Sequence, residues 1–168
     1  MPMKRIFVLV SMSALLLLGT MSPSLAVTPD REHLPLNDDL VIDGVCGFPV
    51  LLHEVRSNIT VTTFFDQEGN VTKQIGAGSL VVQLTNLDTD EAIVVNISGP
   101  GVFTFEGDVL TLTAEGNWLF YFFPGELGPG DPGLIWLTTG LWVWEIRPDG
   151  GSLVTHRGPS RDVCEILA

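Results

Sequence analysis

Apolar and polar residues alternate with a period of two along most of the chain after residue 44. The clearest runs are 79–86, 93–97 and 109–114, each with leucine, isoleucine, valine or alanine at three alternate positions. Successive side chains of a strand point to opposite faces, so this pattern predicts strands with one buried face. No long stretch keeps a helical period, and the one helix expected is a short turn within 160–167.

Turn-forming residues separate these runs at the spacing of β-hairpins. Asp, Asn and Gly gather at 66–70, 106–108 and 148–151, and glycine supplies the positive φ that tight turns need. A Gly- and Pro-rich connection at 124–133 is expected to be a mobile lip. The pattern predicts an all-β fold: a closed or nearly closed antiparallel up-and-down β-barrel of about 8–9 strands, with a β-sandwich as the alternative. The expected strands include 48–55, 59–65, 71–75, 79–86, 109–114, 117–123, 134–137 and 141–147.

The first 26 residues have the order of a secretory signal peptide. Lys4 and Arg5 precede an apolar run at 6–18, and small residues suit cleavage after Ala26. The run is shorter than the ~20 residues of a membrane-spanning helix, so no membrane span is expected after cleavage. Residues 27–43 contain two prolines and five acids and are expected to be an extended acidic arm. A single domain would follow at 44–168, in a protein secreted by a bacterium.

The chain has two cysteines, Cys46 and Cys164. Export to an oxidising compartment favours a disulfide between them, which would tie the first strand to the C-terminal segment. Two free thiols or one metal site are the alternatives, although a two-cysteine site without a nearby histidine suits zinc poorly. No metal site and no cofactor is predicted.

The charge balance narrows the classes of partner. The chain has 20 acidic and 8 basic residues, a net charge of −12. Removing Lys4 and Arg5 with the leader would take this to −14, which is −12 less two positive charges. Nucleic acid and anionic lipid both require a basic surface, so neither is an expected partner.

Catalytic motifs are sparse. The strand residues His53 and His156 would approach one another only if the first and last strands pair. Ser79 lacks the spacing of a nucleophile elbow, and the acidic turn at 66–70 matches no full calcium loop. No catalytic residue is assigned, and the sequence favours a binding protein over an enzyme.

All four tryptophans lie within 118–144, and the segment 118–123 is apolar on both faces of a strand. Three explanations stay open: a strand packed on both sides beneath the 124–133 connection, a self-association interface, or the wall of a pocket for an apolar molecule. The candidate ligand-binding residues are Trp118, Phe120, Tyr121, Trp142, Trp144, His53 and Asn96.

Four short motifs occur in order along the expected domain: Cys46-Gly47-Phe48, Thr85-Asn86, Asp149-Gly150 and Asp162-Val163-Cys164. In these motifs the chain resembles a group of small, uncharacterised secreted bacterial β-rich proteins. The resemblance implies export and paired cysteines but no activity. The strand layout is also loosely similar to that of dirigent proteins, allene oxide cyclases and lipocalins, a likeness of fold that carries no function.

Three functions are compatible with these patterns. The leading hypothesis is a secreted β-barrel that binds a small apolar molecule or a protein partner. The first alternative is a barrel enzyme, similar to an isomerase or cyclase, that works by positioning its substrate. That enzyme would need a buried ionisable group facing inward, such as Glu54 or His53. The second alternative is a structural surface protein that self-associates through its aromatic strand.

Overall fold

The computed structural model describes residues 28–35 and 39–168, so the expected leader and its cleavage site lie outside the described residues. Ten strands form one antiparallel sheet, which confirms the all-β prediction. The one helix among the described residues, α1 (Val163–Ile166), lies within the turn expected at 160–167. The strands are β1 (Asp30–His33), β2 (Leu40–Ile42), β3 (Val50–Phe65), β4 (Val71–Asn86), β5 (Ala92–Asn96), β6 (Gly101–Glu106), β7 (Val109–Phe122), β8 (Leu134–Arg147), β9 (Gly150–Arg157) and β10 (Ser160–Asp162).

Three long strands each carry two short strands along one edge. The order across the sheet is β1-β3-β4-β6-β7-β8-β10, with β2 also on β3, β5 also on β4 and β9 also on β8. Neighbours in the chain are mostly neighbours in the sheet, as the hairpin spacing predicted. β6 connects the two halves of the sheet, because it pairs with β4 on one side and with β7 on the other.

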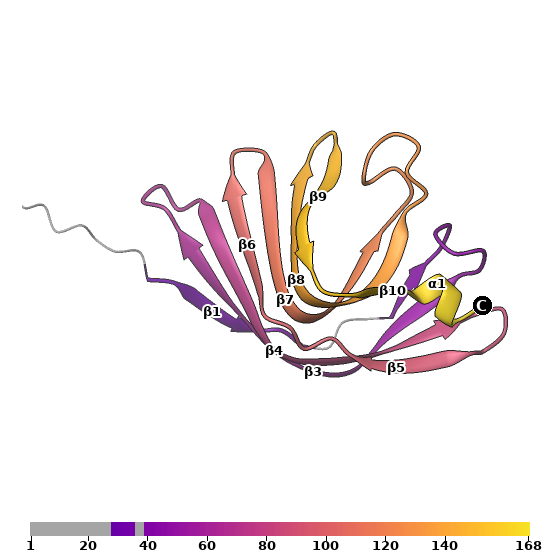
Figure 1. The fold of residues 1–168 in the computed structure, drawn as a ribbon. Helices are drawn as coiled ribbons and strands as arrows, with labels where there is room; N and C mark the ends of the chain where they lie inside the picture. Colours follow the sequence, from indigo (N-terminus) through magenta and orange to yellow (C-terminus); the bar gives the residue numbers. More distant parts are fainter. Residues whose placement is uncertain (1–27, 36–38) are drawn as a thin grey trace, which may run out of the picture.

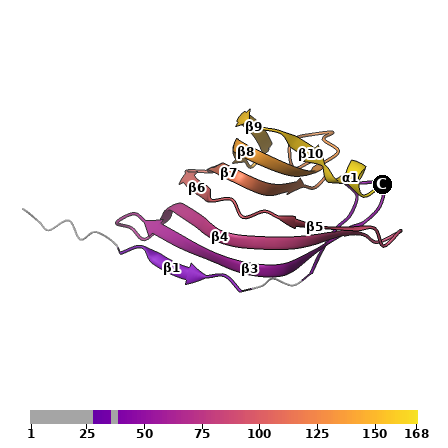
Figure 2. The same cartoon turned by 60° about the horizontal axis from the view of Figure 1, so that its bottom comes forward.

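The closed barrel is not confirmed, because the sheet is open. In the described part of the chain, the strands at the two ends of the order, β1 and β10, do not pair with each other. The sheet instead curves into a deep U (Figure 1). Figure 2 shows β1, β3, β4 and β5 in one layer and β7 to β10 in a second, with β6 between them. Side-chain packing between the layers therefore replaces the hydrogen bonds that would close a barrel.

Several breaks that the sequence suggested are bends inside long strands. The stretches 48–55 and 59–65 fall almost entirely within β3, and β4, β7 and β8 each likewise join two expected strands. Gly78 has φ 143° and Gly140 has φ 102°. A Cβ at Gly78 would lie 2.0 Å from the carbonyl oxygen of Asn58, and one at Gly140 would lie 2.1 Å from that of Arg157. Glycine therefore lets the adjacent backbone come close at each bend.

The segment 27–43 differs from the expected arm, because its described residues contribute two strands to the sheet. β1 pairs with Thr60–Thr63 of β3, and β2 pairs with Val50–Leu52 of the same strand. Ile42 is fully buried, and Leu40 packs against the same apolar core. An uncovered edge of β3 would expose a long row of unpaired backbone groups, and these two strands cover much of it. The folded unit therefore begins ahead of the predicted boundary at 44.

Two apolar cores lie on the two sides of β7 and β8. Leu119 belongs to the first core, between the layers, whereas Phe120 belongs to the second. Side chains on both faces of the segment 118–123 therefore contact an apolar core, although Tyr121 is exposed. Leu127 of the 124–133 connection packs against the second core. The first core includes Ile42, Val50, Val82, Leu84, Ile135, Leu137, Val163 and Leu167, and the second includes Leu112, Ala114, Trp142 and Trp144.

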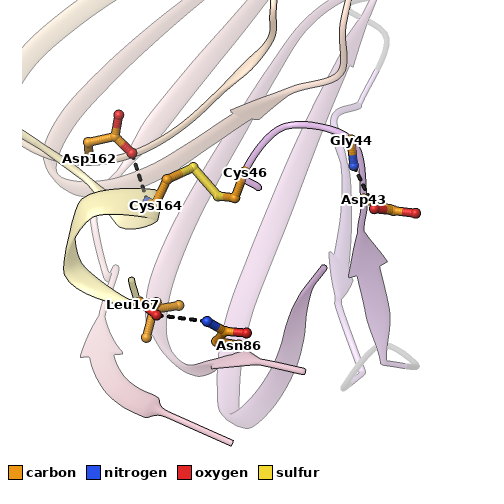
Figure 3. Close-up of a disulfide and its surroundings, with 7 residues drawn as sticks. All are labelled: Asp43, Gly44, Cys46, Asn86, Asp162, Cys164 and Leu167. Carbon is orange, nitrogen blue, oxygen red and sulfur yellow. Dashed lines mark hydrogen bonds between the residues drawn. A yellow bond between two sulfur atoms is a disulfide. The ribbon is translucent and has the colours of Figure 1, made fainter. Parts of the chain in front are cut away.

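The predicted disulfide between Cys46 and Cys164 is present and joins the segment between β2 and β3 to α1 (Figure 3). Its two Cα atoms are 5.3 Å apart, although the cysteines are 118 residues apart in the sequence. Beside it, the Asn86 Nδ2 atom donates a hydrogen bond to the Leu167 carbonyl oxygen at 2.8 Å. The Asp162 carboxylate caps α1 by accepting from the Cys164 backbone N–H. These contacts fasten the two ends of the open sheet to each other.

Candidate functional site

A groove of about 740 Å³ lies between the layers, and its volume is that of a small-molecule site, about 300–1,000 Å³. Its lining is mostly apolar and comes from the β1–β2 segment, β3, β4, the segment leading into β6, β6 itself and β7. The lining residues are Glu32, Leu34, Leu40, Leu52, Glu54, Ser57, Ile59, Val61, Thr63, Gln74, Gly76, Leu80, Val82, Ile97, Gly99, Phe103, Trp118, Leu119 and Tyr121.

A bulge in β3 changes which alternate residues of this strand face the groove. The pairing of β3 with β4 shifts register between Glu54 and Arg56. Before the bulge the groove is lined by even-numbered residues, Leu52 and Glu54, and after it by odd-numbered ones such as Ile59. Because a bulge inserts one extra residue, it moves the alternating set to the other parity while keeping it on the same face. Sequence reasoning named Glu54 as an inward-facing candidate but missed the other β3 residues of the lining, and the parity change was the signal that could have found them.

Trp118 lines the groove from β7. Its ring covers the backbone of the segment that enters β6: a Cβ at Gly99 or at Gly101 would lie 2.4 Å from an atom of the indole. The indole Nε1 donates to the Pro100 carbonyl oxygen at 3.3 Å. The ring also stacks on Phe120, with centroids 5.8 Å apart. The hydrogen bond and the stacking contact hold Trp118 in place, and the glycines beneath it leave room for its ring.

Tyr121 is the most exposed aromatic residue of the groove, with 39% of its surface accessible. Its ring meets that of Phe123 edge to face, with centroids 6.2 Å apart. An apolar molecule in the groove would therefore cover a tyrosine ring that now faces solvent. Of the predicted ligand-binding residues, Trp118 and Tyr121 are the two that line the groove.

The polar groups of the groove carry negative charge or none. Glu54 is half-buried and Glu32 is exposed, and among the described residues of the lining there is no Lys, Arg or His. Gln74 is held by a hydrogen bond from its Nε2 to the Thr63 hydroxyl at 3.2 Å. This charge pattern disfavours an anionic ligand.

A second cavity, of about 690 Å³, lies beneath the 124–133 connection. Its wall combines aromatic residues of β8 with the disulfide. Trp144 is among these residues, but Phe120 and Trp142 line neither space and are packed in the second core. The cavity is lined by Val45, Cys46, Gly47, Leu127, Asp131, Pro132, Gly133, Leu134, Trp136, Trp144, Gly151, Leu153, Asp162 and Cys164.

His53 and Asn96 lie away from both spaces. His53 is exposed on β3, with its Nδ1 atom 2.6 Å from the Asp39 carboxylate. Asn96 is exposed on β5, and its Oδ1 accepts from the Ser98 backbone N–H at 2.9 Å. β3 and β9 do not pair in the described sheet, so strand pairing does not bring His53 beside His156.

In the acidic turn between β3 and β4, the Asp66 carboxylate is hydrogen-bonded to other residues of the same turn. The Asp66 carboxylate accepts from the Asn70 side chain and from the backbone N–H groups of Asn70 and Glu68. The side-chain hydrogen bond from Asn70 is the main reason that the pKa of Asp66 is lowered. Among residues 28–35 and 39–168, no group of three or more His, Cys, Asp or Glu could hold a metal ion. The same residues form no helix long and apolar enough to cross a membrane.

Comparisons with protein-family models, with curated proteins and with solved structures find no match to this chain. Function is therefore inferred from the chemistry of the groove and the cavity.

Proposed function

We propose that this protein is an exported binding protein that takes up a small, uncharged, mainly apolar molecule in the groove between its two layers. The observation that carries the proposal is a groove of about 740 Å³ whose wall is mostly aliphatic and aromatic. Burial of apolar surface would supply the affinity, at about 25 cal/mol per Å². The disulfide supports export, because such bonds persist in oxidising compartments.

The charge of the lining narrows the ligand class further. A fatty acid or another anionic amphiphile would place its charge near Glu32 or Glu54, with no basic residue of the lining to pair with it. The net charge of −12 acts in the same direction at long range. An uncharged ligand is repelled neither by these carboxylates nor by the net negative charge of the protein.

The test uses N-phenyl-1-naphthylamine, an uncharged apolar fluorophore, with laurate as the anionic comparison. Gly76→Val would add an isopropyl group to the wall of the groove, because Gly76 lines it, has an ordinary φ and has no atom within 4 Å of an added Cβ. Gly47→Val is the matched control, since Gly47 has the same open surroundings but lines the other cavity.

We expect saturable binding of the naphthylamine, weakened at least about tenfold by Gly76→Val, unchanged by Gly47→Val, and no binding of laurate. No saturable binding to the wild-type protein, or equal loss in the two variants, would refute the groove as the site. Strong laurate binding would refute the charge argument. Native mass spectrometry of the secreted protein would then identify a copurified molecule; finding a tightly bound protein instead would favour the protein-partner alternative.

A further inference from the structure

The groove between the layers runs along one edge of β7. Trp118 and Leu119 are successive residues of this strand, so their side chains point to its opposite faces. Both line the groove, and so does Tyr121. A space that meets both faces of one strand lies at an edge of that strand, and one edge of β7 is paired with β8 as far as Phe122. The groove therefore adjoins the other edge, which faces away from β8.

The second half of β7 has a free edge on this side. β6 pairs with β7 as far as Ala114, and no other strand of residues 28–35 and 39–168 pairs there. The Glu115 backbone N–H still donates to the Pro100 carbonyl oxygen, at 3.0 Å. Beyond this bond, the free edge extends over 117–122, the length of an extended peptide of about six residues.

The hydrogen bonds of β8 show which backbone groups of β7 point to the free edge. On the side of β8 that faces β10, the Thr139 N–H donates to the Pro159 carbonyl oxygen at 3.1 Å. Backbone groups of successive residues in an antiparallel sheet point to opposite edges, so those of Thr138 point to its partner on β7, Trp118. The N–H and C=O of the next residue, Leu119, therefore point to the free edge.

Tyr121 repeats this direction, because it lies two residues beyond Leu119 in the same strand. Each of these residues thus presents one donor and one acceptor along the groove. Such a row is completed by another extended chain, whose own N–H and C=O groups have the same spacing. Tyr121 is 39% exposed, so the chain can enter at this end of the free edge.

We propose that the molecule taken up by the groove is a short, extended, uncharged peptide, which adds one strand to the free edge of β7. This inference rests on the proposed function, because it names the ligand class of the same groove. The peptide backbone pairs with the N–H and C=O groups of Leu119 and Tyr121, and its alternate side chains enter the apolar groove. The carboxylates of Glu32 and Glu54, which line the groove, disfavour acidic side chains in the peptide.

The test uses the capped peptide acetyl-Thr-Val-Thr-Val-Thr-amide, which is uncharged and has no aromatic ring. It is titrated into the wild-type protein, Tyr121→Ala and Tyr121→Pro, with the naphthylamine titrated in parallel. Both variants remove the phenol ring, but only proline also removes the N–H that points to the free edge, and it leaves the hydrogen bonds to β8 in place. The backbone amide resonances of the wild-type protein report directly on which residues pair with the peptide.

We expect the peptide to bind saturably and to displace the naphthylamine. Tyr121→Pro should bind the peptide about three- to tenfold more weakly than Tyr121→Ala does, the value of one hydrogen bond, and should bind the naphthylamine equally well. In the wild-type protein, the amide protons of Leu119 and Tyr121 should shift downfield with the peptide. Those of Trp118 and Phe120, which point to β8, should not.

Absence of saturable peptide binding to a protein that binds the naphthylamine overturns this inference and leaves the proposed function standing, whereas absence of binding of both probes overturns both. Equal peptide affinities of the two variants overturn the inference, and so do unmoved amide protons of Leu119 and Tyr121 in the saturated wild-type protein. Because the amide protons are measured on the wild-type protein, the test holds even if Tyr121→Pro folds poorly.

Discussion

Removing the disulfide is the most informative perturbation of this fold. The bond spans 118 residues and connects the segment ahead of β3 to α1, the two ends of an open sheet. We therefore consider the double variant Cys46→Ala/Cys164→Ala. In the native state it loses two half-buried sulfur atoms beside the fully buried Val163. In the unfolded state it regains the freedom of a very long loop.

The expected loss in the free energy of unfolding comes mainly from this gain in the entropy of the unfolded chain. In the chain-entropy model, a crosslink closing a loop of this length lowers the entropy of the unfolded chain by an amount equivalent to about 5 kcal/mol. With an m value of about 3–4 kcal/mol per molar in guanidinium chloride, the unfolding midpoint should fall by about 1.5 M. This loss is a large part of the total stability of a domain, which is about 5–15 kcal/mol.

The assay is equilibrium unfolding in guanidinium chloride, followed by tryptophan fluorescence and by circular dichroism. The wild-type protein with a reductant should match the double variant, and the reductant should leave the variant unchanged. If the variant is already unfolded in buffer, an osmolyte such as trimethylamine N-oxide brings its transition into range. A variant that unfolds within about 1 kcal/mol of the oxidised protein refutes both the entropy estimate and the role of the bond in fastening the sheet.

Three further substitutions test individual contacts. Asn86→Ala should lower the free energy of unfolding by about 2–3 kcal/mol in urea unfolding, because it leaves the buried carbonyl of Leu167 without a donor. Asn70→Ala should raise the pKa of Asp66 towards 3.8, its ordinary value, as followed by NMR titration of the carboxyl group. Because a lowered pKa gives stability that is present above the unfolded-state pKa and lost as the pH falls through the folded-state pKa, this variant should lose less stability on acidification than the wild type. Gly78→Ala should cost at least about 2 kcal/mol in urea unfolding, since its φ of 143° and the facing carbonyl leave no room for a Cβ.

Each of these substitutions has a control on the same part of the molecule. Asn96→Ala removes an exposed asparagine and should cost far less than Asn86→Ala. Gln67→Ala changes the same turn and should leave the Asp66 titration in place. Gly76→Ala, with ordinary φ and open space, should be nearly neutral beside Gly78→Ala. Equal effects within any of these pairs would contradict the corresponding contact.

Alternation of side chains was enough to predict strands, because a half-buried strand imposes a period of two on its residues. It was not enough to predict strand length. A glycine at a bend, such as Gly78 within β4, looks the same in sequence as a glycine in a hairpin turn. The β3 bulge had a similar effect, since it changes the parity of the buried set partway along one strand. Local pattern therefore predicted the elements better than their continuity.

The residues that line the groove and the cavity were only partly predicted, because alternation alone does not show which face of a strand meets a cavity. The aromatic segment 118–123 is apolar on both faces, so alternation separates the two sets of side chains without telling which set meets a cavity. Trp118 and Tyr121 line the groove and Trp144 lines the cavity, whereas Trp142 is core. His53 was a candidate because of its imidazole. Before the bulge only even-numbered residues of β3 face the groove, so His53 points to the other side of the sheet.

The groove itself follows from the way the strands diverge beyond β6. β6 pairs with both β4 and β7 near Gly101, which holds the two layers together at that point. Further along, β4 pairs with β5, while no strand of residues 28–35 and 39–168 pairs with β7 on that side. The layers therefore separate, with Trp118 resting on the glycines at the point of divergence. A sheet closed by strand pairing would join the two edges by hydrogen bonds, whereas here a disulfide and a short helix join them. The divergence of the two layers that leaves the sheet open thus also creates the groove.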